Sequence, residues 1–217
     1  MSLKGFQQAL VDLTLAPDSI RALRRGEVDA LDIYDLTARE RARLLDVAGQ
    51  PGVAMNCALA RGNRLELIVA AFPMSCVLLK PLLPRLLDEL WERHRPDNYQ
   101  LFGEEDAFAV FIARKIERGE IVCEYLAEIF EYEIACQTLA RRRETSDEGT
   151  VDLEAVVEFL HSPDQLLSSL GRNVAPPSGL PCGIFRMRIR LSEAGFRLEA
   201  LSDSSEAAQP FSRISRP

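Results

Sequence analysis

The sequence predicts an α+β protein, with a mainly helical N-terminal domain followed by a small α/β domain that contains a β-hairpin. Before residue 141, apolar residues recur mostly at three- and four-residue intervals, as in amphipathic helices. Residues 141–149 are charged or small and contain no large apolar side chain, which marks a boundary. Residues 185–200 then alternate between apolar and polar side chains, the period of a strand. We therefore expect domains at residues 1–147 and 148–201 and a disordered tail at 202–217.

The N-terminal region predicts short helices separated by turns. The expected elements are helices over residues 6–13, 18–25 and 38–47 and a turn near residue 28. Thr37 precedes the third helix and Glu40 follows three residues later, a capping-box pattern that satisfies two amide groups at the start of a helix. Gly49, Pro51 and Gly52 are expected to end this helix.

The stretch from Met55 to Trp91 predicts a core hairpin of helices on which the rest of the chain packs. The expected apolar face of its first half comprises Leu59, Leu65, Ile68, Val69 and Phe72. The residues expected to lie mostly away from that face are Arg61, Asn63, Arg64 and Glu66. Pro73 disfavours helix at Phe72, so the chain turns there, and Ser75 offers the next N-cap.

Two further helices are expected before the boundary. The first follows Gly103 and runs to about Arg118, and its acidic first turn, residues 104–106, suits the positive end of the helix dipole. The second runs over residues 122–143 with an apolar inner side. Its outer side carries Glu124, Glu128, Glu131 and Glu133. We interpret this acidic row as a solvated helix face, with paired carboxylates for acid–base chemistry as the alternative.

The second domain contains the clearest strand pattern in the sequence. A strand over residues 185–191, a turn over 192–195 and a strand over 196–200 predict the hairpin. A helix over residues 163–170 is expected after Ser162, with a proline at its first position. Residues 151–159 fit either a strand or a short helix.

The hairpin supplies the candidate partner-binding residues. Arg186, Arg188 and Arg190 alternate along one strand and therefore share one face of the sheet, which Arg197 can join from the other strand. Such a face attracts acids: an acidic peptide, a phosphate backbone or the protein's own acidic helices. A solvent-exposed or internally paired face is the alternative. The edge of so small a sheet can also accept an extended peptide as an added strand.

No residue pattern points to catalysis, a metal site or a cofactor, so we expect a protein that is not an enzyme. His94 and His161 are far apart in sequence, and neither has a second histidine or a cysteine at helical spacing. The G-x-G-x-x-G, Walker A and G-x-S-x-G motifs are absent from the sequence. The 5 cysteines form no Cys-x-x-Cys pair and are expected to be reduced and buried.

Charge and hydropathy predict a soluble cytoplasmic protein. The net charge of −7 disfavours a nonspecific grip on nucleic acid or anionic lipid. The N-terminus lacks the apolar core of a secretory signal. The longest uncharged apolar run, Leu67 to Leu79, is shorter than the roughly 20 residues that span a bilayer.

The segments ALARGNRLELIVAAFP (58–73), RPDNYQLFGEEDAFAVFIARKI (95–116) and EYLAEIFEYEIA (124–135) resemble a helical family that carries the label of a DNA-binding domain. Members of that family accompany multinuclear non-haem iron oxidases that modify ribosomally made peptides. Residues 151–153 and 165–170, followed by a hairpin, are similar to the second domain of methanobactin-type maturation partner proteins. The resemblance implies a non-catalytic adaptor that complexes with the iron oxidase through its helical domain. It also implies that residues 185–191 form a platform for the leader of a small precursor peptide, bound as an added strand.

Two alternatives remain beside this reading. The family label implies a DNA-binding transcriptional regulator, although the sequence shows no helix-turn-helix with a basic recognition helix. The segment DLTARERARLL (35–45) is similar to the small helical subunit of extradiol ring-cleavage dioxygenase. That similarity implies an accessory helical domain.

Overall fold

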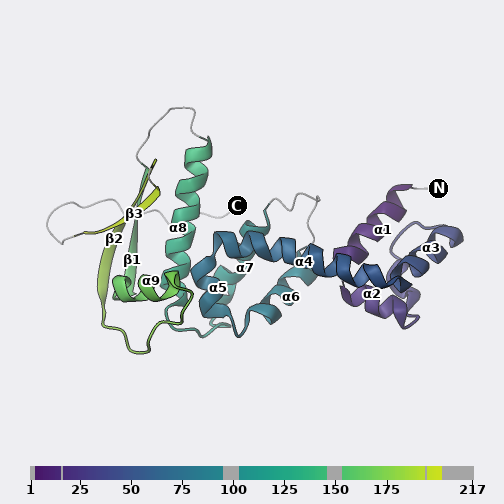
Figure 1. The fold of residues 1–217 in the computed structure, drawn as a ribbon, viewed down its shortest axis with the longest axis horizontal. Coiled ribbons are helices and arrows are strands. Elements are labelled where there is room, and N and C mark those ends of the chain that lie inside the picture. The colour runs from purple at the N-terminus through teal and green to yellow at the C-terminus, as the bar shows by residue number, and fades with distance from the viewer. Residues whose placement is uncertain (1–2, 16, 95–102, 146–152, 194, 202–217) are drawn as a thin grey trace. The chain divides into compact units, whose positions relative to one another are not determined.

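The computed structural model describes residues 3–15, 17–94, 103–145, 153–193 and 195–201 (Figure 1). The chain divides into two compact units, residues 1–127 and 128–217. The described part of the first unit is helical, and the second combines a long helix, a short helix and a three-stranded antiparallel sheet. The predicted α+β class, with helices first and a small α/β region after them, is confirmed.

Three helices and a 3₁₀ turn open the first unit. They are α1 (Leu3–Leu15), α2 (Pro17–Arg24), η1 (Val28–Leu31) and α3 (Ala38–Gly49). The capping box at α3 is present as predicted. The Thr37 hydroxyl accepts a hydrogen bond from the Glu40 amide, 3.2 Å away, and the Glu40 carboxylate accepts one from the Thr37 amide at 2.8 Å.

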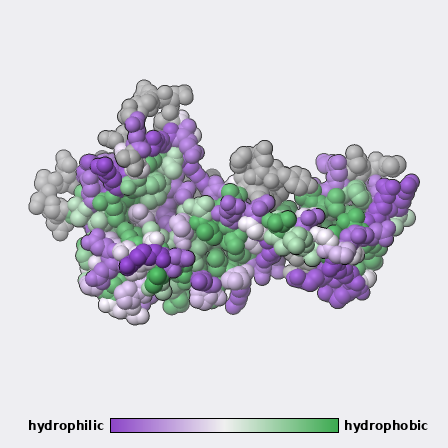
Figure 2. Space-filling view, in the orientation of Figure 1, coloured by the Kyte–Doolittle hydropathy of each residue, from purple (hydrophilic) through white to green (hydrophobic). Residues whose placement is uncertain are grey.

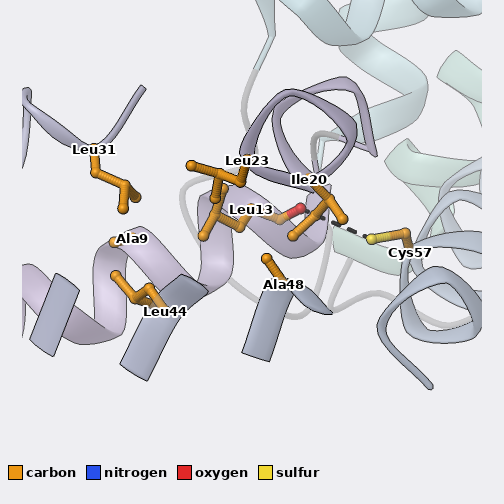
Figure 3. Close-up of a cluster of buried hydrophobic side chains, with 8 residues drawn as sticks. All are labelled: Ala9, Leu13, Ile20, Leu23, Leu31, Leu44, Ala48 and Cys57. Carbon is orange, nitrogen blue, oxygen red and sulfur yellow. Dashed lines mark hydrogen bonds between the residues drawn. The ribbon is translucent and has the colours of Figure 1, made fainter. Parts of the chain in front are cut away.

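A cluster of buried side chains joins these elements to the start of the next helix (Figure 3). Its members are Ala9, Leu13, Ile20, Leu23, Leu31, Leu44, Ala48 and Cys57. The Cys57 thiol also donates to the Leu13 carbonyl oxygen, 3.8 Å away. Because burial of one leucine side chain contributes about 1.5–3 kcal/mol, this cluster is a core for the N-terminal helices.

The central stretch forms α4 (Pro51–Ala71), α5 (Pro73–Leu79) and α6 (Leu83–Arg93), and α7 (Glu104–Glu117) follows. Pro51 and Gly52 do not end α3 as expected, because they form the first turn of α4. Proline is tolerated there, since an N–H at the first position of a helix has no partner within the helix. Pro73 likewise starts α5, so Phe72 is the N-cap and Ser75 lies buried inside the helix. Among the described helices none can span a membrane alone, whereas α4 and α5, bent by 110°, pass that test as a pair by length and composition.

The prediction that Arg64 lies away from the core is wrong. Its side chain is 1% exposed, and two of its nitrogens lie 2.9 Å from the two carboxylate oxygens of Glu104, also 1% exposed. The Trp91 indole N–H donates to the same carboxylate at 2.6 Å, and the guanidinium lies 4.8 Å from the indole ring centre. Arg64 therefore ties α4 to the start of α7, while Leu59, expected in the core, is 58% exposed.

The second unit is built on a sheet in the order β1-β2-β3. Its elements are α8 (Leu126–Thr145), β1 (Leu153–His161), α9 (Pro163–Gly171), β2 (Cys182–Ser192) and β3 (Gly195–Ala200), with α8 and α9 beside the sheet (Figure 1). The predicted hairpin is β2 and β3. The segment that fitted either a strand or a helix is β1, which pairs with β2 in antiparallel register.

The division between the units differs from the predicted boundary near residue 147, because α8 packs on the sheet. The Tyr132 ring lies 5.9 Å from the Phe159 ring of β1, and Arg143 donates to the Ser192 carbonyl oxygen at 2.9 Å. The predicted tail at 202–217 lies outside the described residues.

The acidic row of α8 is not a solvated face throughout. Glu124 lies in the turn before α8 and is exposed, and Glu131 of the helix is exposed as well, whereas Glu128 and Glu133 are 6% and 4% exposed. The burial of Glu128 is explained by β1, which supplies hydrogen-bond donors to its carboxylate.

Candidate partner-binding site on the sheet

The sheet has one buried face and one exposed face, as expected for an antiparallel sheet covered on one side. The buried face holds Val157 and Phe159 of β1 and Met187, Ile189 and Leu191 of β2. The alternate positions of all three strands form the opposite face, which we call the outer face. The strand period therefore places the predicted arginines on the outer face.

The structure brings the four predicted arginines together. Arg186, Arg188 and Arg190 follow one another along the central strand, and Arg197 of β3 lies directly opposite Arg190. Arg190 and Arg197 therefore place two positive charges side by side, and like charges opposite each other across two strands repel.

Three glutamates lie among these arginines and were missed as site residues by the sequence reasoning. They are Glu154 and Glu158 of β1 and Glu199 of β3. Arg186 donates to Glu158 at 2.8 Å. The Glu154 carboxylate lies 3.7 Å from Arg188 and 3.6 Å from Arg190, and Glu199 lies 3.7 Å from Arg190. Internal pairing, one of the alternatives considered for this face, is thus present for three of the four arginines.

These ion pairs differ in quality. The Arg186–Glu158 contact is a hydrogen bond, whereas the contacts of Arg188 and Arg190 exceed the usual 2.7–3.2 Å for a nitrogen donor and an oxygen acceptor. The Arg188 Nε is buried and has no hydrogen-bond partner among the described residues. No ion pair joins Arg197 to another residue in the described ranges. At the end of the outer face that holds Arg188, Arg190 and Arg197, guanidinium N–H groups therefore remain that can donate further hydrogen bonds.

The other end of the outer face is apolar. Ile184 of β2 is 74% exposed and Leu160 of β1 is 60% exposed, and Val156 lies opposite Arg188 between the two ends. Exposed apolar residues also occur in the first unit, on α4 at Met55 and Leu59. Figure 2 shows hydrophobic residues among hydrophilic ones on the face in view.

The two outer strands of the sheet end differently. At a bulge near the end of β1, one oxygen of Glu128 accepts hydrogen bonds from the amides of Leu160, at 2.7 Å, and His161, at 3.1 Å. The other oxygen lies 2.6 Å from Nδ1 of His161. A helix side chain thus occupies the donors at this end of β1.

β3 keeps an open edge within the described part of the chain. The Leu201 amide donates to the Arg186 carbonyl oxygen at 2.9 Å, so these two residues form a hydrogen-bonded pair. Because such pairs alternate along an antiparallel ladder, Ala200, Leu198 and Phe196 point their backbone N–H and C=O groups away from β2. These groups form a template for another strand.

The remaining titratable groups include no metal-binding cluster among the described residues. No group of three or more His, Cys, Asp or Glu side chains there is placed to hold a metal ion. None of the five cysteines is in a disulfide. Cys57 and Cys76 are buried and Cys123 and Cys136 are partly buried, whereas the expected burial is wrong for Cys182, which is exposed. Burial raises the pKa of Cys136 to about 11, which keeps this thiol protonated at neutral pH.

Comparison with known proteins gives one partial match. No family model and no solved structure matches the chain. A stretch of 122 residues is 34% identical to the aliphatic sulfonates import ATP-binding protein SsuB 2 of Streptomyces avermitilis. The match covers 54% of this chain and 48% of that protein, so the chain spans about half the length of this curated relative.

That partial match carries no nucleotide site to this chain. The pattern G-x-x-x-x-G-K-[ST], whose backbone amides cradle phosphates in P-loop proteins, does not occur in the sequence.

Proposed function

We propose that this protein is a non-catalytic partner in a peptide-modifying complex, in which it binds a small precursor peptide and an iron-dependent oxidase. The open edge of β3 is the observation that carries the proposal. An extended peptide that pairs there gains hydrogen bonds from the outward groups of Phe196, Leu198 and Ala200. The resemblance of the sequence to partners of iron oxidases supplies the class of complex.

The preference for β3 over β1 follows from what covers each strand. The last amides of β1 already donate to Glu128, and its side chains Glu154 and Glu158 are exposed. Those carboxylates are paired with Arg186, Arg188 and Arg190, so β1 itself offers no unpaired positive charge to a peptide with acidic residues. Beside β3, Arg197 provides an exposed positive charge that attracts such a peptide.

The helical unit is the proposed contact with the oxidase. Met55 and Leu59 lie one turn apart on α4 and expose apolar side chains. Exposed apolar groups of this kind are common at protein–protein interfaces. DNA is a less favourable ligand for the sheet unit, because three glutamates among the arginines repel phosphates.

Copurification tests the proposal. The tagged protein is expressed together with the products of its neighbouring genes, and the bound material is examined by mass spectrometry and by iron analysis. We expect a small peptide and an iron-containing oxidase to copurify. Absence of both from the purified sample, or a sequence-specific shift of DNA at moderate salt, would contradict the proposal.

A further inference from the structure

The outer face of the sheet has two chemically different ends. At one end Arg188 and Arg190 share the carboxylates of Glu154 and Glu199, and Arg197 lies opposite Arg190. At the other end Leu160 and Ile184 are exposed. We propose that this face binds an amphipathic helix of a partner protein, with one carboxylate of that helix at the arginine end and its apolar side chains over the apolar end. The identity of the partner rests on the proposed function, and the chemistry of the face is independent of it.

The charge at the arginine end indicates that the ligand carries a single carboxylate there. Three guanidinium groups face two carboxylates, which leaves one positive charge in excess. The contacts of 3.6–3.7 Å leave guanidinium N–H groups without short hydrogen bonds to these carboxylates. A single carboxylate can accept two such N–H groups and matches the excess charge, whereas the glutamates repel a doubly charged phosphate.

The length of the face defines the spacing on the ligand. From Arg190 to Ile184 the strand runs about 20 Å, at about 3.3 Å per residue. A helix rises about 1.5 Å per residue and turns once every 3.6 residues. Its acidic and apolar side chains must therefore be about 14 residues, or four turns, apart, so that both lie on the same face of the helix. Helices cover the faces of sheets, while an added strand pairs at the edge, so this ligand and a peptide on β3 occupy different positions.

Between the two ends of the outer face lies one ion pair whose charges already compensate each other. Arg186 and Glu158 form a hydrogen bond at 2.8 Å and neutralise each other, and Val156 lies beside Arg188. The ligand helix therefore needs no charge in its middle portion. The expected ligand has a short acidic end and a longer apolar stripe.

Synthetic helical peptides test this proposal with the full chain. One capped, alanine-rich peptide carries a single Glu and, about 14 residues away on the same helix face, a single Leu. The second differs only by Gln in place of Glu. Binding of fluorescein-labelled peptides is measured by anisotropy. We expect the Glu peptide to bind about tenfold more tightly than the Gln peptide, because it adds a charge-assisted contact.

Variants of the face complete the test. In the double variant Arg188→Gln/Arg197→Gln, the preference for the Glu peptide should fall below about twofold. The control Arg172→Gln, which changes an exposed arginine at the C-cap of α9, should keep the preference. Glu199→Gln removes a competing carboxylate and should strengthen binding of the Glu peptide. Equal binding of both peptides to the unmodified protein, or a preference that survives in the double variant, would overturn the proposal. Failure of an oxidase to copurify bears on the proposed function and leaves this readout unchanged.

Discussion

At the scale of single residues, Arg64 shows how a charged side chain can belong to the core. A buried guanidinium is tolerated only when its donors are satisfied, and here Glu104 accepts two of them and the His94 carbonyl oxygen accepts another at 3.0 Å. The carboxylate is in turn held by the Trp91 indole. The network links α4, α6 and α7 across a stretch of chain, so it fixes the packing of the first unit.

Removal of one member of this network is expected to destabilise the first unit strongly. Arg64→Met leaves the Glu104 carboxylate buried without its guanidinium, which should lower the free energy of unfolding by about 3–5 kcal/mol. Urea unfolding followed by fluorescence measures this loss, because Trp91 is the only tryptophan of the chain and lies in the network. The double variant Arg64→Met/Glu104→Leu should lose less than the single variant. A loss of under about 1 kcal/mol for Arg64→Met would contradict this description.

The thiols are expected to differ in reactivity according to burial. Burial raises the pKa of Cys57, Cys123 and Cys136, so the thiolate fraction of these groups at pH 8 is below that of a free cysteine. Iodoacetamide should therefore modify exposed Cys182 first in the native protein, and all five in urea. For Cys136 the rate should keep rising as the pH increases toward about 11. Peptide mass spectrometry assigns each site, and fast labelling of Cys136 at pH 8 would disagree with its burial.

At the scale of elements, β1 is completed by a side chain from a helix. Glu128 of α8 accepts hydrogen bonds from both backbone amides at the bulge. It thus satisfies amides at the end of a strand, as an N-cap side chain does at the start of a helix. Glu128→Ala leaves two amides without this acceptor and should lower the free energy of unfolding by about 1–3 kcal/mol. Glu128→Gln keeps an acceptor oxygen and should lose less.

Hydrogen exchange locates this effect. In Glu128→Ala the amides of Leu160 and His161 should exchange faster, while amides in the middle of β2 keep their protection. Unchanged exchange at these two amides would mean that Glu128 does not hold the end of β1.

The elements were predictable from the sequence to different degrees. The capping box at Thr37 and the alternation in residues 185–200 depend on local spacing, and both predictions are confirmed. The partners of Arg64 and Glu128 lie 40 and 32 residues away, at Glu104 and Leu160, so local periodicity placed both side chains in solvent. The arginine face was predictable because a strand fixes its own alternation. Two of its glutamates, Glu154 and Glu158, depend on the pairing with β1, whose segment 151–159 fitted two structures. The third, Glu199, alternates within the predicted hairpin, which was the available signal.

At the scale of the whole molecule, α8 belongs with the sheet. It contributes Tyr132 and Arg143 to contacts with β1 and with the end of β2. A fragment of residues 126–217 is therefore expected to fold, with cooperative thermal unfolding by circular dichroism. The shorter fragment of residues 148–217, which starts at the predicted boundary, lacks the helix that covers Phe159 and should not unfold cooperatively. Cooperative unfolding of the shorter fragment would show that α8 is dispensable for this unit.

The function proposed for the whole molecule depends on the open edge of β3. Ala200→Pro removes an outward N–H from that edge and places a ring there, whereas Ala200→Thr keeps the N–H and suits a strand. Ala200 is exposed, so neither change empties the core.

The most direct measurement is therefore the amount of precursor peptide that copurifies with each of these proteins when they are expressed with the neighbouring genes. We predict that the unmodified protein and Ala200→Thr retain the peptide and that Ala200→Pro retains at least about tenfold less. Equal retention by all three proteins, or no peptide with any of them, would contradict strand addition at β3.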